Sequence, residues 1–231
     1  MSGRPRRRAV LFDLFNTLIP GGSRDQRDKT SLLMAGELGV DPIGLADLVR
    51  DTFDDRTRGR LGDLSTTVRW LACRLGVDPT AAQVDAAVEF RLGMTRSLHQ
   101  RTWAIPALTE LRQAGVPCGL VSDCSAETLE IWSDSPLAPY FDGLSLSCVT
   151  GYRKPAPEAY TTAMKALQVQ PEECIYIGDG GSYELKGATA LGIRAVRFVP
   201  PDALRGESID EELDWTGEVV TDLVDLLPMV I

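Results

Sequence analysis

The chain has 231 residues, of which 44% are hydrophobic and 25% charged, a composition typical of a folded globular protein that excludes wholesale disorder. Its net charge of −9 argues against nucleic acid as a partner, because contacts with phosphates need a clustered positive field. No apolar run approaches the ~18 residues that span a bilayer, so we expect no membrane contact either.

In chain order, the first element is the short apolar run 9–12, which predicts a buried strand that ends at Asp13. From about residue 23 to residue 99, apolar residues recur every three or four positions, which predicts helices and no strand. After Pro106, short apolar runs alternate with helical stretches, a pattern typical of βαβ units in a parallel sheet. The expected strands are 118–123, 144–148, 174–179 and 194–199, and the expected helices are 106–114, 126–132, 157–167 and 182–191.

The long helical stretch separates the first strand from the others. We therefore predict an α/β fold in which a core domain, residues 1–19 and 105–231, carries an inserted all-helical cap domain, residues 20–104. Neither the oligomeric state nor the substrate can be derived from this pattern, and a monomer and a homodimer both fit it.

The content of histidine and cysteine limits the chemistry. His99 is the only histidine, which argues against Ser–His or Cys–His catalysis and against multi-histidine metal sites. The five cysteines are odd in number, widely spaced and without a CxxC pair, so we expect neither a zinc site nor a disulfide framework, and a cytoplasmic location fits best. Four arginines in residues 1–8 precede an apolar run that is too short for a secretory signal.

Polar side chains of suitable chemistry follow the expected strands. Asp13 ends the first, Ser122 and Asp123 end the second, Asp179 ends the fourth, and Lys154 precedes the helix 157–167. Each aspartate alone is also explained as a helix cap or turn residue. Because active sites of parallel sheets lie beyond the carboxyl ends of the strands, we expect the set to converge on one edge.

This set suits transfer of a phosphoryl group. Asp13 can act as a nucleophile, and Asp13 and Asp179 can bridge a Mg²⁺ ion, which prefers oxygen ligands. Lys154 can pair with both Asp13 and the substrate anion, while Ser122 can donate to a phosphoryl oxygen.

Four segments resemble the ordered motifs of the haloacid dehalogenase-like (HAD) hydrolase superfamily: 11–18, 120–122, 153–158 and 177–184. The resemblance implies a Rossmann-like three-layer core with a parallel sheet, a nucleophile at Asp13, a phosphate-binding Ser122 and a charge-balancing Lys154. It also implies Mg²⁺ bound by Asp13, the main-chain carbonyl of Phe15 and Asp179, with Glu184 at the place of the family's second acidic residue. Most characterised members are phosphatases, so we expect a small phosphorylated metabolite, hydrolysed through an aspartyl-phosphate on Asp13.

Phe15 departs from the phosphatase pattern, which has a second aspartate there to protonate the leaving group. General acid–base help is worth roughly 10²–10⁴-fold. Three interpretations follow: another acid is supplied by Asp123, Asp54, Asp55 or the substrate; the leaving group is a good one; or the protein is a weak enzyme or a non-catalytic binding protein.

A 2-haloacid dehalogenase is the other alternative, because those enzymes also carry an aromatic residue at this position and attack carbon without a metal. Their fourth motif resembles Ser-Ser-Asn, whereas this chain has Asp179 and Glu184. Keeping two acids there favours a Mg²⁺-dependent phosphatase.

Further candidates for binding the substrate are Asn16, Asp123 and Arg58. Arg58 belongs to a basic cluster with Arg56 and Arg60, for which a solvated helix end is the favoured interpretation. His99 is expected to be structural.

Overall fold

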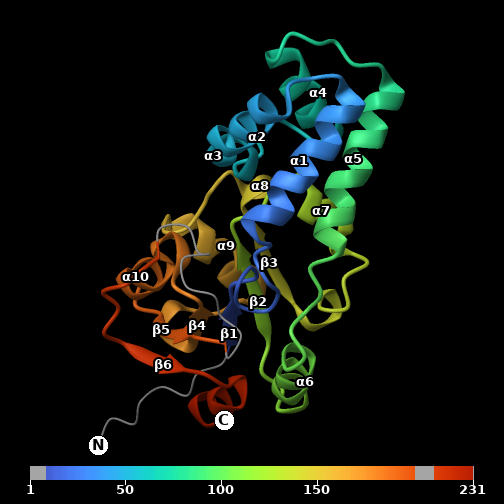
Figure 1. The fold of residues 1–231 in the computed structure, drawn as a ribbon. Helices are drawn as coiled ribbons and strands as arrows, with labels where there is room; N and C mark the ends of the chain where they lie inside the picture. The colour runs from blue at the N-terminus through green and yellow to red at the C-terminus, as the bar shows by residue number, and fades with distance from the viewer. Residues whose placement is uncertain (1–8, 201–210, 231) are drawn as a thin grey trace, which may run out of the picture.

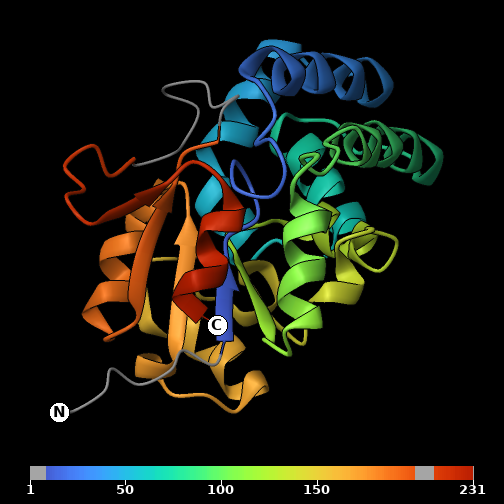
Figure 2. The same ribbon diagram turned by 90° about the horizontal axis from the view of Figure 1, so that it is seen from below.

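The computed structural model describes residues 9–200 and 211–230 (Figure 1). The arginine-rich start of the chain lies outside these residues. Six parallel strands form one sheet in the order β3-β2-β1-β4-β5-β6, with β1 in its middle (Figure 2). The strands are β1 Ala9–Phe12, β2 Cys118–Ser122, β3 Gly143–Leu146, β4 Cys174–Gly178, β5 Arg194–Phe198 and β6 Glu218–Val220.

Alternation of side chains along β1 explains the layers on the two faces of the sheet. Val10 and Phe12 pack in one hydrophobic cluster together with residues of helices α6, Ala104–Gln113, and α11, Leu227–Val230. Ala9 and Leu11 pack in another, which includes residues of α9, Pro157–Leu167, and α10, Glu184–Ala190. Both faces are covered, so the central strands are apolar without a polar face.

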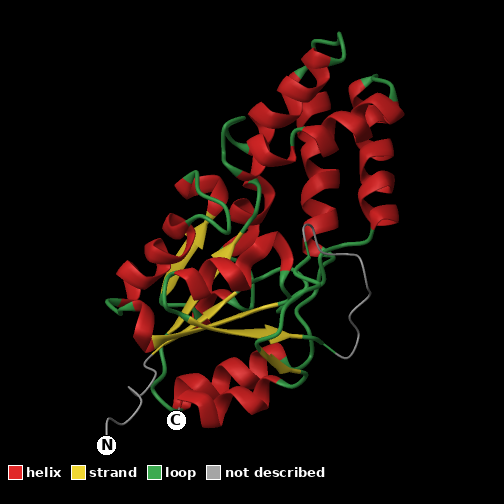
Figure 3. Cartoon of the chain, turned by 90° about the vertical axis from the view of Figure 1, so that its left-hand side faces the viewer, coloured by secondary structure: helices red, strands yellow, loops and turns green. Residues whose placement is uncertain are grey.

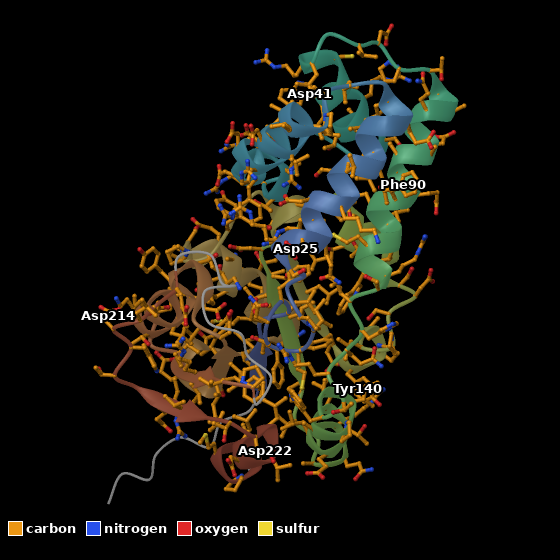
Figure 4. All side chains as sticks on the ribbon, in the orientation of Figure 1. Asp25, Asp41, Phe90, Tyr140, Asp214 and Asp222 are labelled. Carbon is orange, nitrogen blue, oxygen red and sulfur yellow. The ribbon has the colours of Figure 1, made fainter. Side chains whose placement is uncertain are left out.

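A helical insertion, α1 to α5, follows β1 and lies at one end of the sheet (Figure 3). It packs around its own hydrophobic cluster, which includes Met34, Leu38, Val68 and Leu71. All of its helices except α3 start at side-chain caps, among them Asp41, which lies at the end away from the sheet (Figure 4). The helices are α1 Arg24–Leu38, α2 Pro42–Asp51, α3 Phe53–Thr57, α4 Leu64–Arg74 and α5 Ala81–Arg96.

The α/β fold with a parallel sheet and an inserted helical unit is confirmed, and the domain boundaries at residues 20 and 104 stay a prediction. Helix α7 spans Ala126–Trp132, as expected for 126–132. The third strand ends early, because Ser147 and Cys148 begin a short helix, α8, Ser147–Thr150. Strand β6 and helix α11 were not expected. Within the described residues, no helix combines the length and apolarity needed to cross a bilayer.

Candidate active site

Four of the expected residues come together beyond the carboxyl ends of β1 and β4. The Asp13 backbone N–H donates to the carbonyl of Ile177, at 2.8 Å, which fixes the end of β1 against β4. The buried Lys154 ammonium donates to Asp13 Oδ1 and, at 2.6 Å, to Glu184 Oε2. Asp179 completes the group, because one oxygen of each of the three carboxylates lies within 4.8 Å of the others.

Glu184 is fully buried and held on every side. The Tyr176 hydroxyl donates to its Oε2 at 2.7 Å, and the Gly180 backbone N–H donates to its Oε1 at 2.9 Å. Position 178 must be glycine for this approach, because a Cβ there would lie 2.0 Å from Oε1. The solvated helix position that is usual for such a glutamate is therefore excluded.

Among the described residues, three carboxylates surround one ammonium in this cluster. Burial, with Asp179 nearby, raises the pKa of Asp13 to about 6 although Lys154 opposes the shift. Burial likewise raises the pKa of Glu184 well above its usual range. For Lys154, burial lowers the pKa, but Asp13 and Glu184 outweigh it and keep the ammonium charged. A buried site of this kind is complementary to a cation.

The donor set fits a hard divalent cation. Asp13, Asp179 and Glu184 offer oxygen ligands only, which suits Mg²⁺ and does not suit soft transition metals. Two of Glu184's three hydrogen bonds fall on Oε2, and the third on Oε1. Each of the three carboxylates could hold such an ion.

Ser122 and Thr17 add hydroxyls at the same edge. The Thr17 hydroxyl donates to Asp13 Oδ2 at 3.0 Å and orients the carboxylate. Ser122 Oγ is buried, with the residue 1% exposed, and has no hydrogen-bond partner among the described residues. An unsatisfied buried hydroxyl costs about 1–3 kcal/mol, so its position requires a partner that a bound anion can supply.

Asp123 does not offer a free carboxylic acid. Its Oδ1 accepts from the Lys154 backbone N–H at 3.0 Å, and its Oδ2 lies 3.4 Å from Arg153 Nε. These contacts fix the loop that carries Lys154 next to the loop that carries Ser122.

The expectation of a solvated helix end for the basic cluster of the helical insertion is wrong for Arg56, whereas Arg60 is exposed. Arg56 is 7% exposed and donates to the Val49 carbonyl at 2.8 Å and to Ser125 Oγ at 3.3 Å. Arg58 pairs with Asp54 and donates to the Gly151 carbonyl of the α/β part at 3.1 Å. Arg56 and Arg58 therefore join the two parts of the chain, and the described contacts of Arg58 do not include Asp13 or Ser122.

Asp54 is bound by arginines as well. Arg153 Nη1 lies 2.9 Å from its Oδ1, and Arg60 Nη1 lies 3.2 Å from its Oδ2. Burial opposes the effect, but hydrogen bonds from Arg153 and Arg58 lower the pKa of Asp54. Asp55 pairs with Arg60 at 2.8 Å. An ionised, paired carboxylate is a poor general acid.

Phe15 and Asn16 shape the chain between Asp13 and α1. Phe15 packs against the hydrophobic cluster of the sheet and lines a pocket of about 420 Å³, together with Leu98 and Trp132. His99 lines this pocket too. Asn16 has a φ of 62° and accepts from the Gly21 backbone N–H at 2.8 Å, so it closes the turn out of β1. This contact gives Asn16 a structural part.

Glu212 is a residue that the sequence analysis missed. It is 0% exposed and its carboxylate accepts from the backbone N–H groups of Leu185, at 2.7 Å, and Lys186, at 3.2 Å. Its own N–H donates to the Gly180 carbonyl at 2.9 Å. Glu212 thus caps the first turn of α10 and ties down the loop between Asp179 and Glu184. No local sequence signal marks it, because its partners lie some thirty residues earlier.

The fold places the side chains of Asp13, Asp179, Glu184 and Lys154 together at one edge of an α/β sheet. The family model of haloacid dehalogenase-like hydrolases matches residues 7–192, and the chain belongs to that family. Glu212 and strand β6 lie beyond the matched residues.

Two curated relatives are phosphatases. The chain is 28% identical to a glyceraldehyde 3-phosphate phosphatase of Methanopyrus kandleri over 83% of each chain. It is 27% identical to a ribulose-1,5-bisphosphate 5-phosphatase of Halopiger xanaduensis over 94% of this chain and 98% of that protein. Among solved structures, the L-2-haloacid dehalogenase of Xanthobacter autotrophicus has the same fold, with a TM-score of 0.62 at 20% identity over 97% and 98% of the chains.

Proposed function

We propose that the protein is a Mg²⁺-dependent phosphatase of a small phosphorylated metabolite and that it acts through an aspartyl-phosphate on Asp13. The observation that carries the proposal is the buried group of Asp13, Asp179, Glu184 and Lys154 beside the unsatisfied hydroxyl of Ser122. The activities of the two curated relatives, both phosphatases of small phosphorylated sugars, support the same class of substrate.

In the first step, an Asp13 carboxylate oxygen attacks phosphorus, and the bond from phosphorus to the leaving oxygen breaks. The Ser122 hydroxyl donates to a phosphoryl oxygen, and Lys154 balances the charge that the phosphoryl group adds beside Asp13. Water then attacks the phosphorus of the aspartyl-phosphate, which releases inorganic phosphate and restores the Asp13 carboxylate. The released alcohol takes its proton from solvent, because Phe15 has none to give.

Asp13, Asp179 and the Phe15 main-chain carbonyl are the ligands that we propose for Mg²⁺, with Glu184 in support. The ion supplies neutralisation of charge on the transferring phosphoryl group. In this chain, Tyr176 and Gly180 hold Glu184, and Thr17 orients Asp13, so the ligands are positioned before any ion binds.

The helical insertion acts in this proposal as a cap, residues 20–104, that covers the site and excludes water. The Asp54–Arg153 pair and the Arg58–Gly151 hydrogen bond support it, because both join the insertion to the segment that precedes Lys154.

The 2-haloacid dehalogenase alternative has two supporting features, the aromatic Phe15 and the shared fold. Attack on carbon needs no cation, however, so a dehalogenase mechanism does not explain why Asp179 and Glu184 lie close to Asp13. The carboxylate cluster therefore favours the phosphatase.

Phosphate release from a panel of phosphorylated metabolites, with and without Mg²⁺, tests the proposal. We expect Mg²⁺-dependent release that Asp13→Asn lowers by about 10⁴-fold or more, as for loss of other catalytic nucleophiles. Asp214→Asn, an exposed aspartate next to Lys186, is the matched control and keeps full activity. Equal release by Asp13→Asn and the natural protein contradicts the proposal, and so does halide release from 2-chloropropionate that survives a chelator.

A further inference from the structure

Two thiols lie in contact beside the candidate active site. Cys124 and Cys148 are free, and their Sγ atoms are 3.8 Å apart. Cys124 follows Ser122 and Asp123 after β2, and Cys148 belongs to α8 after β3. Nothing in the phosphatase chemistry uses either sulfur.

The backbone around the pair is tied together. Ser147 Oγ accepts from the Cys124 backbone N–H at 2.9 Å and donates to the Cys124 carbonyl at 3.2 Å. On the other side, a Cβ added at Gly59 of the helical insertion would lie 2.1 Å from the Cys148 carbonyl oxygen. The thiol pair thus sits between the loop of Ser122 and the contact of the insertion with α8.

The two thiols differ in exposure and in pKa, as do the attacking and resolving cysteines of a redox-active pair. Cys148 is partly exposed, whereas Cys124 is 2% exposed. A hydrogen bond with Cys124 lowers the pKa of the Cys148 thiol, and the same hydrogen bond together with burial raises the pKa of Cys124. Cys148 is therefore the accessible sulfur with more thiolate character, and Cys124 is placed to resolve its oxidised form.

We propose that Cys124 and Cys148 are a redox modification site, at which a hydroperoxide converts the thiol pair into a reversible disulfide. The Cys148 thiolate attacks a peroxide oxygen, the O–O bond breaks, and Cys148 becomes a sulfenic acid while the departing oxygen takes a proton. Cys124 sulfur then attacks Cys148 sulfur, and the hydroxyl leaves with the Cys124 proton as water. The two thiols are oxidised and hydrogen peroxide is reduced to two molecules of water.

The disulfide has a consequence at the active site. A disulfide needs its sulfurs about 2.05 Å apart, so the pair closes by more than 1 Å from 3.8 Å. The Ser122–Asp123 loop and α8 share this movement, and Asp123 holds the loop of Lys154. Displacements near 1 Å at such positions cost up to about 10²-fold in rate, and we expect about a tenfold loss of hydrolase activity. This second part rests on the proposed function, whereas the disulfide itself does not.

Stoichiometric hydrogen peroxide added to the reduced full-length protein tests the site. We expect the titratable thiols of the denatured protein to fall from five to three, and a non-reducing peptide map to join the peptides of Cys124 and Cys148. Dithiothreitol restores five thiols and the activity. We expect Cys148→Ser to keep its activity after treatment with peroxide. The matched control, Cys73→Ser, removes an exposed cysteine of the insertion and still loses activity when peroxide is added.

A map that joins other cysteines, or a Cys148→Ser protein that is inactivated as fast as Cys73→Ser, overturns the proposal. If the disulfide forms while activity is unchanged, the regulatory part fails and the modification site stands. A natural protein that releases no phosphate contradicts the proposed function, while the peptide map still decides the redox site.

Discussion

Two buried ionic clusters in this chain have opposite composition. At the edge of the sheet, Asp13, Asp179 and Glu184 surround one ammonium, that of Lys154. Between the helical insertion and α7, Arg56 and Arg91 surround one carboxylate, that of Glu127. Counted over the described residues, the first cluster has more carboxylates than cations and the second has more cations than carboxylates.

The pKa values of the acids move in opposite directions. Burial raises the pKa of Asp13 to about 6. Burial acts on Glu127 as well, but Arg91 and Arg56 outweigh it and lower its pKa to about 2. The Val49 carbonyl and the Ser125 hydroxyl each accept a hydrogen bond from Arg56 in the second cluster, while Arg56 Nε has no hydrogen-bond partner among the described residues. Counter-charges within the protein lower the pKa of Glu127 and make its cluster structural, whereas the raised pKa of Asp13 marks a group of carboxylates that favours a bound cation.

Glu127→Gln removes the carboxylate of the structural cluster and has the largest expected effect on the stability of the fold. Loss of this carboxylate leaves two buried arginines without a counter-charge and lowers the free energy of unfolding by about 3 kcal/mol, measured by urea denaturation. Glu89→Gln, which removes an exposed partner of Arg96, is the matched control and costs under about 1 kcal/mol.

The ionisation of Glu127 also makes the stability of the fold depend on pH in the acid range. The pKa of Glu127 is lower in the folded chain than its ordinary 4.5, so its contribution is complete above that pH and is lost as the pH falls from about 4.5 to about 2. In Glu127→Gln, the free energy of unfolding therefore lacks the fall that Glu127 causes between about pH 4.5 and about pH 2. An unchanged acid profile would show that the pair does not stabilise the fold.

Phe15→Asp extends the comparison to the candidate active site, because it restores the aspartate that the phosphatase pattern has at this position. We expect kcat on alkyl phosphate esters to rise by about 10²-fold, with a smaller gain on acyl phosphates, whose leaving groups need no proton. Phe15→Leu keeps the apolar contact without the acid and shows no gain. Equal gains on both classes of substrate, or none, would contradict the interpretation of Phe15 as a missing acid.

Glu212→Gln has the smallest expected effect and tests how firmly the acidic cluster is held. Weaker capping of α10 loosens the loop between Asp179 and Glu184, so the Mg²⁺ dissociation constant measured by calorimetry rises by about tenfold. Asp214→Asn, a few residues away and exposed, leaves it unchanged. An unaltered Mg²⁺ affinity in Glu212→Gln would limit the residue to a structural part.

The elements that position the site could be predicted because their signals are local. Strands β1 and β4 are short apolar runs, and the polar residues that follow them mark the sheet edge without knowledge of the packing. Glu184 was placed in the site by its motif, but its burial and its hydrogen bonds with Lys154 and Tyr176 depend on distant segments.

Other features could not be predicted because their partners are far apart in the chain. Arg56 lies in a run of charged residues that is typical of a solvated helix end, and only the contact with α7, about seventy residues later, buries it. Glu212 and β6 follow a stretch without clear periodicity, and the three residues of β6 are too few to show alternation. The proximity of Cys124 and Cys148 arises from the pairing of β2 with β3.

Mg²⁺ binding to the natural protein and to Asp179→Asn, followed by thermal unfolding and calorimetry, tests the central claim most directly. If the carboxylates bind Mg²⁺, the ion raises the unfolding temperature of the natural protein, because an ion bound only by the folded state stabilises that state. Asp179→Asn is predicted to unfold at a higher temperature than the natural protein without Mg²⁺, because charge repulsion with Asp13 is relieved, and to gain little when Mg²⁺ is added. Equal Mg²⁺ responses of the two proteins, or no response of the natural protein, would contradict it.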